Sequence, residues 1–139
     1  MKTSSILGLV TALLAIFTIS GCSNNGNPLA PYQPEINNVT DNFQFQATAM
    51  RDVNFTMDYI WRNTNDTATV NQSASAGLTG IATLEILDSL GTLVYSRSLK
   101  DDGTFGTSQR LAAEPGPWIL RVHLVRVSGT LNFRVQKAS

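Results

Sequence analysis

The chain has little cysteine, little histidine and little charge. Its 139 residues include one cysteine and one histidine, and only 14% of them are Asp, Glu, Lys or Arg. A single cysteine forms no internal disulfide and supplies no thiolate cluster for zinc. Ten basic side chains balance ten acidic ones, so the chain lacks the positive charge with which nucleic-acid-binding proteins attract phosphates. A chain of this length forms at most one small domain, stabilised by an apolar core.

The longest uncharged apolar stretch lies at the N-terminus. After Lys2, residues 6–19 are mainly Ile, Leu, Val, Ala and Phe. This stretch is shorter than the roughly 20 residues that a helix needs to cross the hydrocarbon core of a membrane. We therefore expect residues 1–21 to be a removable signal segment rather than a permanent span.

The residues that follow are Ile19, Ser20, Gly21 and Cys22. They resemble the lipobox of bacterial lipoproteins, in which an aliphatic residue and two small residues precede an acceptor cysteine. The resemblance implies that Gly21 is the last residue removed and that Cys22 receives diacylglycerol. Each buried CH₂ of an acyl chain adds about 0.8 kcal/mol, so two or three chains anchor a protein effectively permanently. The alternative is a general secretory signal with an unrelated cysteine.

Residues 22–38 contain the lipidated cysteine and a predicted flexible tether. Pro28, Pro31 and Pro34 interrupt any regular element, and the apolar residues show no periodicity. Ser23 resembles the outer-membrane sorting context of enterobacterial lipoproteins. We therefore expect a protein that is anchored by lipid in the bacterial cell envelope, in the outer membrane, with a globular domain at residues 39–139.

From Val39 onward the hydrophobic pattern has a period of two, which is typical of half-buried strands. The predicted strands are residues 43–49, 53–62, 67–72, 81–87, 92–99, 104–111, 118–127 and 130–136. About eight short strands separated by turn residues predict an all-β fold, a single antiparallel β-sandwich or jelly roll. Residues 81–90 also fit a helix that ends at Gly91, but the alternation of apolar residues there favours a strand.

The apolar positions change phase between the last two predicted strands. A β-bulge near Leu124 and Val125 restores one apolar face, and we expect a hairpin turn at residues 128–129. In the resulting register Phe133 is buried and Arg134 is exposed.

Two segments of the domain, residues 84–96 and 114–135, resemble bacterial pre-peptidase C-terminal domains. These are small secreted β-sandwiches with an Asp-containing turn, then Pro-Gly, an aromatic residue and a final hairpin. The resemblance implies an accessory role in binding or secretion beside a secreted hydrolase. Members that bind calcium use acidic residues near the strand that corresponds to residues 80–84, and this chain has none there. Asp101 and Asp102 fit a hairpin turn, so we expect neither a metal nor another cofactor.

Only His123 is available as a general base, and the alternation places it on the outward face of a strand. Neither a G-x-S-x-G elbow nor an S-x-x-K pattern accompanies it. We therefore expect a surface histidine and no catalytic site.

Candidate binding residues are two tryptophans at strand ends and polar residues of the last two predicted strands. A tryptophan ring at a strand end either stacks on a sugar or caps the core. The candidates are Trp61, Trp118, Arg121, His123, Arg126 and Arg134.

Three functions remain open at this point. We favour a non-catalytic envelope protein that binds or scaffolds through its sandwich, and a glycan-binding accessory module is the alternative. A small hydrolase has only the support of His123. The expected partners are the membrane, through Cys22, and an envelope protein or polysaccharide, but no nucleic acid.

Overall fold

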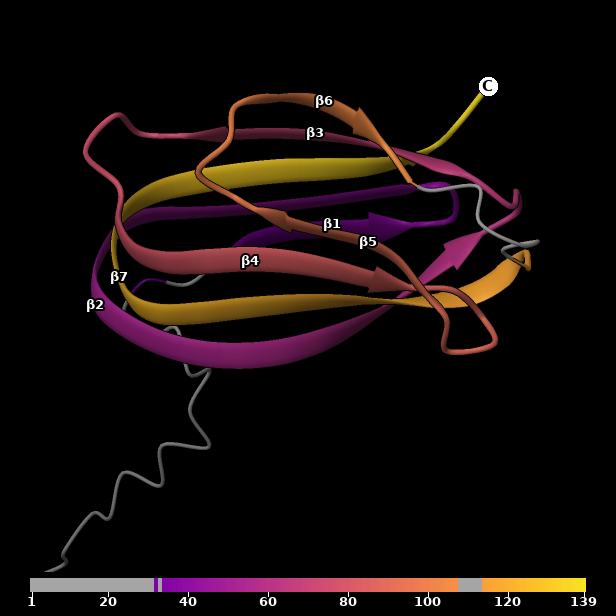
Figure 1. The fold of residues 1–139 in the computed structure, drawn as a ribbon, viewed down its shortest axis with the longest axis horizontal. Helices are drawn as coiled ribbons and strands as arrows, with labels where there is room; N and C mark the ends of the chain where they lie inside the picture. The colour runs from indigo at the N-terminus through magenta and orange to yellow at the C-terminus, as the bar shows by residue number, and fades with distance from the viewer. Residues whose placement is uncertain (1–31, 33, 108–113) are drawn as a thin grey trace, which may run out of the picture.

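The computed structural model describes residues 32, 34–107 and 114–139, which form an antiparallel β-sandwich, as predicted (Figure 1). The strands are β1 (Glu35–Val39), β2 (Asn42–Asn63), β3 (Ala68–Ala74), β4 (Thr79–Leu87), β5 (Leu93–Ser98), β6 (Gly103–Gly106) and β7 (Gly116–Lys137). The predicted signal segment, Gly21 and Cys22 lie outside the described residues. Across the part of the chain that is described, no helix is long and apolar enough to span a membrane.

The two longest strands, β2 and β7, form an antiparallel ribbon that bends back on itself (Figure 1). Their pairing runs from Asn42 opposite Gln136 to Asn63 opposite Gly116. Register shifts interrupt it between Ala47 and Phe55, where the ribbon turns. Each long strand therefore contributes one half to each layer of the sandwich.

The other strands pair with the two halves of this ribbon. On one side of the bend the order is β1-β2-β7-β3-β6, which we call the five-stranded sheet. On the other side β4 pairs with both β7 and β5, which gives the order β2-β7-β4-β5, the four-stranded sheet.

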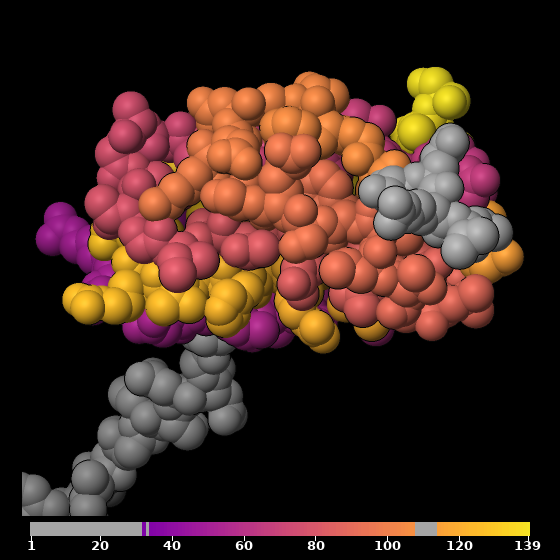
Figure 2. All heavy atoms as spheres, viewed as in Figure 1, coloured from indigo at the N-terminus to yellow at the C-terminus, as the bar shows by residue number. Residues whose placement is uncertain are grey.

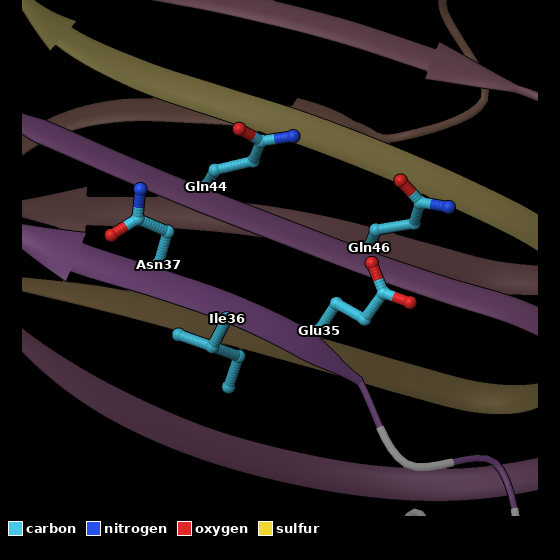
Figure 3. Close-up of a pocket in the computed structure, with 5 residues that line it drawn as sticks. All are labelled: Glu35, Ile36, Asn37, Gln44 and Gln46. Carbon is cyan, nitrogen blue, oxygen red and sulfur yellow. The ribbon is translucent and has the colours of Figure 1, made fainter.

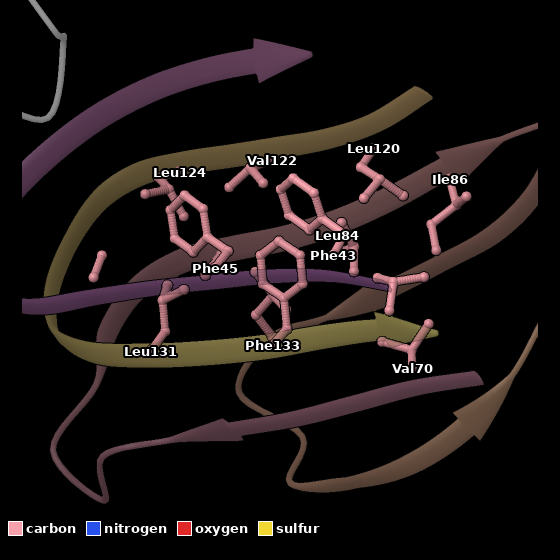
Figure 4. Close-up of a cluster of buried hydrophobic side chains, with 14 of the residues drawn as sticks. Phe43, Phe45, Val70, Leu84, Ile86, Leu120, Val122, Leu124, Leu131 and Phe133 are labelled. Carbon is pink, nitrogen blue, oxygen red and sulfur yellow. The ribbon is translucent and has the colours of Figure 1, made fainter. Parts of the chain in front are cut away.

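The core lies between the two sheets and is rich in aromatic side chains (Figure 4). Phe45 and Phe133, which are neighbours in the five-stranded sheet, stack with their ring centroids 5.1 Å apart. Leu84 and Leu120 of the four-stranded sheet belong to the same buried cluster and are fully buried. Alternate residues of each strand supply this core, as the period of two predicts.

Seven strands are present in the described part of the chain. Two predicted pairs are continuous, which reduces the eight predicted strands to six, and β1 is an additional strand. Residues 43–49 and 53–62 both belong to β2, and residues 118–127 and 130–136 both belong to β7. The predicted hairpin turn at Ser128 and Gly129 is therefore wrong. Gly129 pairs with Met50 inside the ribbon. A Cβ on Gly129 would lie 2.9 Å from the Leu78 side chain, so the glycine makes room for a covering segment rather than for a reversal of the chain.

The predicted β-bulge is confirmed. Val53 pairs with Val127 and Phe55 pairs with Leu124, so β7 carries one extra residue between these pairs. Arg126 lies in the bulge with a φ of 51°. The expected burial of Phe133 and exposure of Arg134 are confirmed as well, and β4 confirms a strand rather than a helix at residues 81–87.

Four of the five residues of strand β1 lie in the predicted tether, residues 22–38, and the fifth is Val39. The strand pairs with β2 from Glu35 opposite Gln46 to Val39 opposite Asn42. All five residues of β1 are exposed, so this edge strand has no alternating pattern that reveals it in the sequence. The sheet therefore begins at Glu35, before the predicted domain start at residue 39.

Candidate functional site

Both tryptophans lie in the core rather than on a ligand surface. Trp61 and Trp118 are fully buried, and their rings meet edge to face with centroids 5.9 Å apart. The indole Nε1 of Trp61 donates to the carbonyl oxygen of Val39 at 3.2 Å, and that of Trp118 donates to the carbonyl oxygen of Glu114 at 2.8 Å. Their inclusion among the candidate binding residues is therefore wrong, since neither ring offers a face to a ligand. They cap the core at the end away from the bend.

The polar candidates of β7 do not lie on one surface. Arg121 and His123 face outward from the four-stranded sheet, whereas Arg134 faces outward from the five-stranded sheet. Arg126 lies at the bulge between the two halves of the strand. The bend of β7 thus separates residues that a straight strand would have kept together.

On the outer face of the four-stranded sheet, the polar side chains bind one another. Nε and Nη2 of Arg121 each donate to one carboxylate oxygen of Asp58 at 2.8 Å, and Nη1 lies 4.0 Å from a carboxylate oxygen of Glu85. The hydrogen bonds between Arg121 and Asp58 lower the pKa of Asp58 and raise that of Arg121. Nδ1 of His123 lies 2.7 Å from the hydroxyl of Thr56. The predicted surface histidine is thus exposed and already has a partner.

Beside these polar residues, aliphatic side chains form a row across the same four strands. Pairing places Ile60 next to Ile119, Ile119 next to Leu87, and Leu87 next to Leu93. Ile60 is 70% exposed and Leu93 is 54% exposed. Figure 2 shows the side of the molecule on which β4 and β5 lie. This row was not predicted, because alternation alone assigns these positions to a polar face.

The outer face of the five-stranded sheet is dominated by side-chain amides, and we call it the amide face. In register across four strands lie Asn37, Gln44, Arg134 and Asn71. On either side of this row, further amides occupy outward positions of β2 and β7. These flanking amides are Asn42, Gln46, Asn132 and Gln136.

A shallow hollow of about 190 Å³ lies on the amide face, between β1 and β2. Glu35, Asn37, Gln44 and Gln46 line it and project to the same side of their strands, whereas Ile36 points the other way (Figure 3). The hollow is therefore polar on the side from which a ligand would approach.

Among the residues that the structure describes, most of these amides have no protein partner. Within the described residues, no hydrogen bond joins the side chain of Asn37, Gln44, Gln46, Asn132 or Gln136 to another protein group. Two amides of the face do accept hydrogen bonds. Asn42 Oδ1 accepts one from Nε of Arg134 at 2.7 Å, and Asn71 Oδ1 accepts one from the hydroxyl of Thr104 at 2.5 Å. As far as the described residues go, the amide face thus presents donors and acceptors that are open to water or a ligand.

The signal for this face was present in the sequence at the outward positions of residues 43–49 and 130–136. What the sequence did not reveal is that β1, β2, β7 and β3 lie side by side in this order. Only that order turns isolated polar residues into a continuous surface.

Asp101 and Asp102, the candidate calcium ligands, have partners within the protein. Asp102 Oδ1 accepts a hydrogen bond from the backbone nitrogen of Ala74 at 2.8 Å. Oδ2 of Asp101 lies 3.9 Å from Nη1 of Arg97. In residues 32, 34–107 and 114–139, no group of three or more His, Cys, Asp or Glu side chains is placed to hold a metal ion.

The chain matches no protein-family model and no curated protein. Among solved structures it is similar to one described as "CBM4 structure and function", at 12% identity and a TM-score of 0.40 over 83% of this chain and 91% of that chain. It is also similar to the family 11 carbohydrate-binding module of a cellulosomal cellulase of Clostridium thermocellum, at 11% identity and a TM-score of 0.38 over 77% and 81% of the two chains. At these identities and TM-scores the similarities carry no conclusion about a ligand.

Proposed function

We propose that this protein is a polysaccharide-binding module and that its ligand lies across the amide face. The observation that carries the proposal is the set of outward amides in register on neighbouring strands, without protein partners among the described residues. We also propose that the module is anchored in the bacterial cell envelope through a lipid on Cys22.

Side-chain amides suit a ligand rich in hydroxyl groups. Each amide has a carbonyl oxygen that accepts and an NH₂ group that donates, and each sugar hydroxyl also does both. A single hydrogen bond contributes only about 0.5–1.5 kcal/mol net. A ligand must therefore contact several amides at once in order to bind firmly.

The length of the amide row favours a polymer over a single sugar. The row crosses from β1 to β3, three strand spacings of about 4.8 Å, and so extends over roughly 14 Å. A polysaccharide chain laid across the strands contacts Asn37, Gln44 and Asn71 together, whereas one sugar ring reaches only adjacent strands.

The proposal is tested with the Cys22→Ala protein and a panel of immobilised neutral and acidic polysaccharides. We expect retention on at least one of them, and we expect Gln44→Ala combined with Gln46→Ala to lower the affinity at least 10-fold. Thr56→Ala combined with Thr83→Ala is the matched control, because both residues face outward from the four-stranded sheet. Equal losses in the two double variants would reject the amide face as the binding site.

Because both tryptophans are fully buried in the core, their fluorescence should not change on binding. The anchor is tested separately with fatty-acid labelling, which Cys22→Ala should abolish while releasing the protein from the membrane fraction. A Cys22→Ala protein that still carries labelled lipid would reject the anchor but not the binding face.

A further inference from the structure

The side chains of the three arginines of β7 have different hydrogen-bond partners. Arg121 is paired with Asp58, and Nε of Arg126 lies 3.1 Å from Oδ1 of Asp52. Arg134 instead donates from Nε to the neutral amide oxygen of Asn42 at 2.7 Å. Among the described residues, no carboxylate lies within salt-bridge distance of Arg134.

The bond to Asn42 holds the Arg134 side chain through Nε and leaves the two Nη groups, with four N–H donors, for another partner. Arg134 is exposed on the amide face. Its register neighbours are Gln44 on β2 and Asn71 on β3. The positive charge is therefore flanked on both sides by amides rather than by acidic groups.

Two acidic residues lie toward the margins of this outer face, Glu35 on β1 and Asp102 just before β6, and both are offset from Arg134. Glu35 lies on β1, two strands away from β7, and its register partner on β2 is Gln46 rather than Gln44. With strands about 4.8 Å apart and residues on one face about 6.7 Å apart, the Cα atoms of Glu35 and Arg134 are separated by roughly 12 Å. Asp102 has the same offset on the other side and already accepts a hydrogen bond from the backbone nitrogen of Ala74. In the described part of the chain, neither carboxylate pairs with Arg134, so its positive charge lies at the centre of the face.

We propose that the amide face selects acidic polysaccharides and that Arg134 binds the carboxylate of a uronic acid unit. This inference rests on the proposed function and names the class of its ligand. A carboxylate presents two oxygens in a plane that matches the planar guanidinium, and such pairs form short, strong hydrogen bonds. Gln44 and Asn71 then bind hydroxyl groups of the same unit and its neighbour.

The test compares polygalacturonate with its methyl ester, which has the same backbone but no charge, and with dextran sulfate. The Cys22→Ala protein should bind polygalacturonate at least 10-fold more tightly than the methyl ester. Arg134→Gln should reduce this ratio to about one, and Arg134→Lys should restore it in part, because lysine keeps the charge but not the planar fork. Arg121→Gln, on the other face, should leave the ratio unchanged.

Equal affinity for polygalacturonate and its methyl ester would overturn the inference, as would an Arg134→Gln protein that keeps the ratio. Equal affinity for dextran sulfate would also overturn it, since charge alone would then account for binding. Retention on neutral polysaccharides only would overturn this inference and leave the proposed function standing, whereas retention on no polysaccharide would overturn both. Thermal unfolding of each variant shows whether the fold is intact.

Discussion

The two outer faces of the sandwich both carry polar side chains, yet these side chains have different partners on the two faces. On the four-stranded sheet, Arg121 binds Asp58 and His123 contacts Thr56. On the five-stranded sheet, most outward amides have no protein partner among the described residues. The difference arises because one register places opposite charges side by side, while the other places amides beside amides. A polar face is thus available for binding only when its side chains are not already paired with side chains of the neighbouring strands.

The largest expected effect concerns the core that supports both faces. Phe133 is fully buried and stacks on Phe45, so Phe133→Ala should lower the free energy of unfolding by about 3–5 kcal/mol. Arg134→Ala, at the next residue but on the amide face, should lower it by about 0.5 kcal/mol or less. Denaturant unfolding measures both. A larger loss at Arg134 would contradict the division of β7 into an inner and an outer side.

A smaller effect is expected at the bend that separates the two faces. Gly80 has a φ of +83°, and a Cβ there would lie 2.3 Å from the carbonyl oxygen of Arg126 in the bulge. Gly80→Ala should therefore cost roughly 1–3 kcal/mol. Gly77→Ala is the matched control, because a Cβ on Gly77 would have no neighbouring atom within 4 Å, and it should change stability by about 0.5 kcal/mol or less. Equal effects would mean that the bulge does not depend on Gly80.

Tyr59 links the two sheets, since its ring contacts Phe43 at a centroid distance of 5.4 Å. Burial raises the pKa of Tyr59 from 10.0 to about 12, which means that the folded state holds the proton more tightly than the unfolded state. Its contribution to stability is complete below pH 10 and is lost as the pH rises toward 12. Tyr59→Phe should weaken this alkaline loss in denaturant unfolding.

Burial also raises the pKa of Tyr95 to about 12, so part of the alkaline loss should remain in Tyr59→Phe. At pH 7 the variant should unfold much like the original protein. An unchanged alkaline loss would show that the Tyr59 hydroxyl is solvated in the folded state.

The smallest expected effect concerns the ion pair between Arg121 and Asp58 on the outer face of the four-stranded sheet. Hydrogen bonds from Arg121 lower the pKa of Asp58 below its ordinary 3.8, so this pair stabilises the fold above about pH 4 and the contribution is lost as the pH falls further. Arg121→Gln should reduce the loss of stability that sets in as the pH falls below about 4, whereas Arg134→Gln should not. An equal change in both variants would mean that the two faces have the same electrostatics.

Sequence periodicity predicted the inner side of nearly every strand, because burial repeats every second residue. It also located the bulge, since the apolar residues at Leu124 and Val127 are out of phase. Periodicity and turn residues wrongly predicted a hairpin turn at Ser128 and Gly129. A small residue such as Gly129 allows a sharp turn of the chain, but it equally allows another segment to pack closely against a continuous strand, as happens here. Strand β1 was not predicted because all five of its residues are exposed, so its sequence has no alternation of apolar and polar residues.

The candidate site was harder to predict than the fold. Arg134 was assigned correctly to an exposed position, but Arg121 and Arg126 were grouped with it because the bend in β7 was not foreseen. Trp61 and Trp118 are in phase with the buried residues of their strands, which favours the core. They were nevertheless included as candidates because a tryptophan ring at a strand end can also stack on a sugar. The amide face depends on strand order, which follows from contacts between residues far apart in the chain.

The shared ribbon also has a kinetic consequence. Partners in β2 and β7 are between 53 residues apart, from Asn63 to Gly116, and 94 residues apart, from Asn42 to Gln136. Neither sheet can form completely until β2 and β7 have paired. Because this pairing requires loop closure over such long separations, we expect folding to be slow, in the range of about milliseconds to seconds. Until the ribbon closes, the edges of the shorter strands stay unpaired and open to other chains.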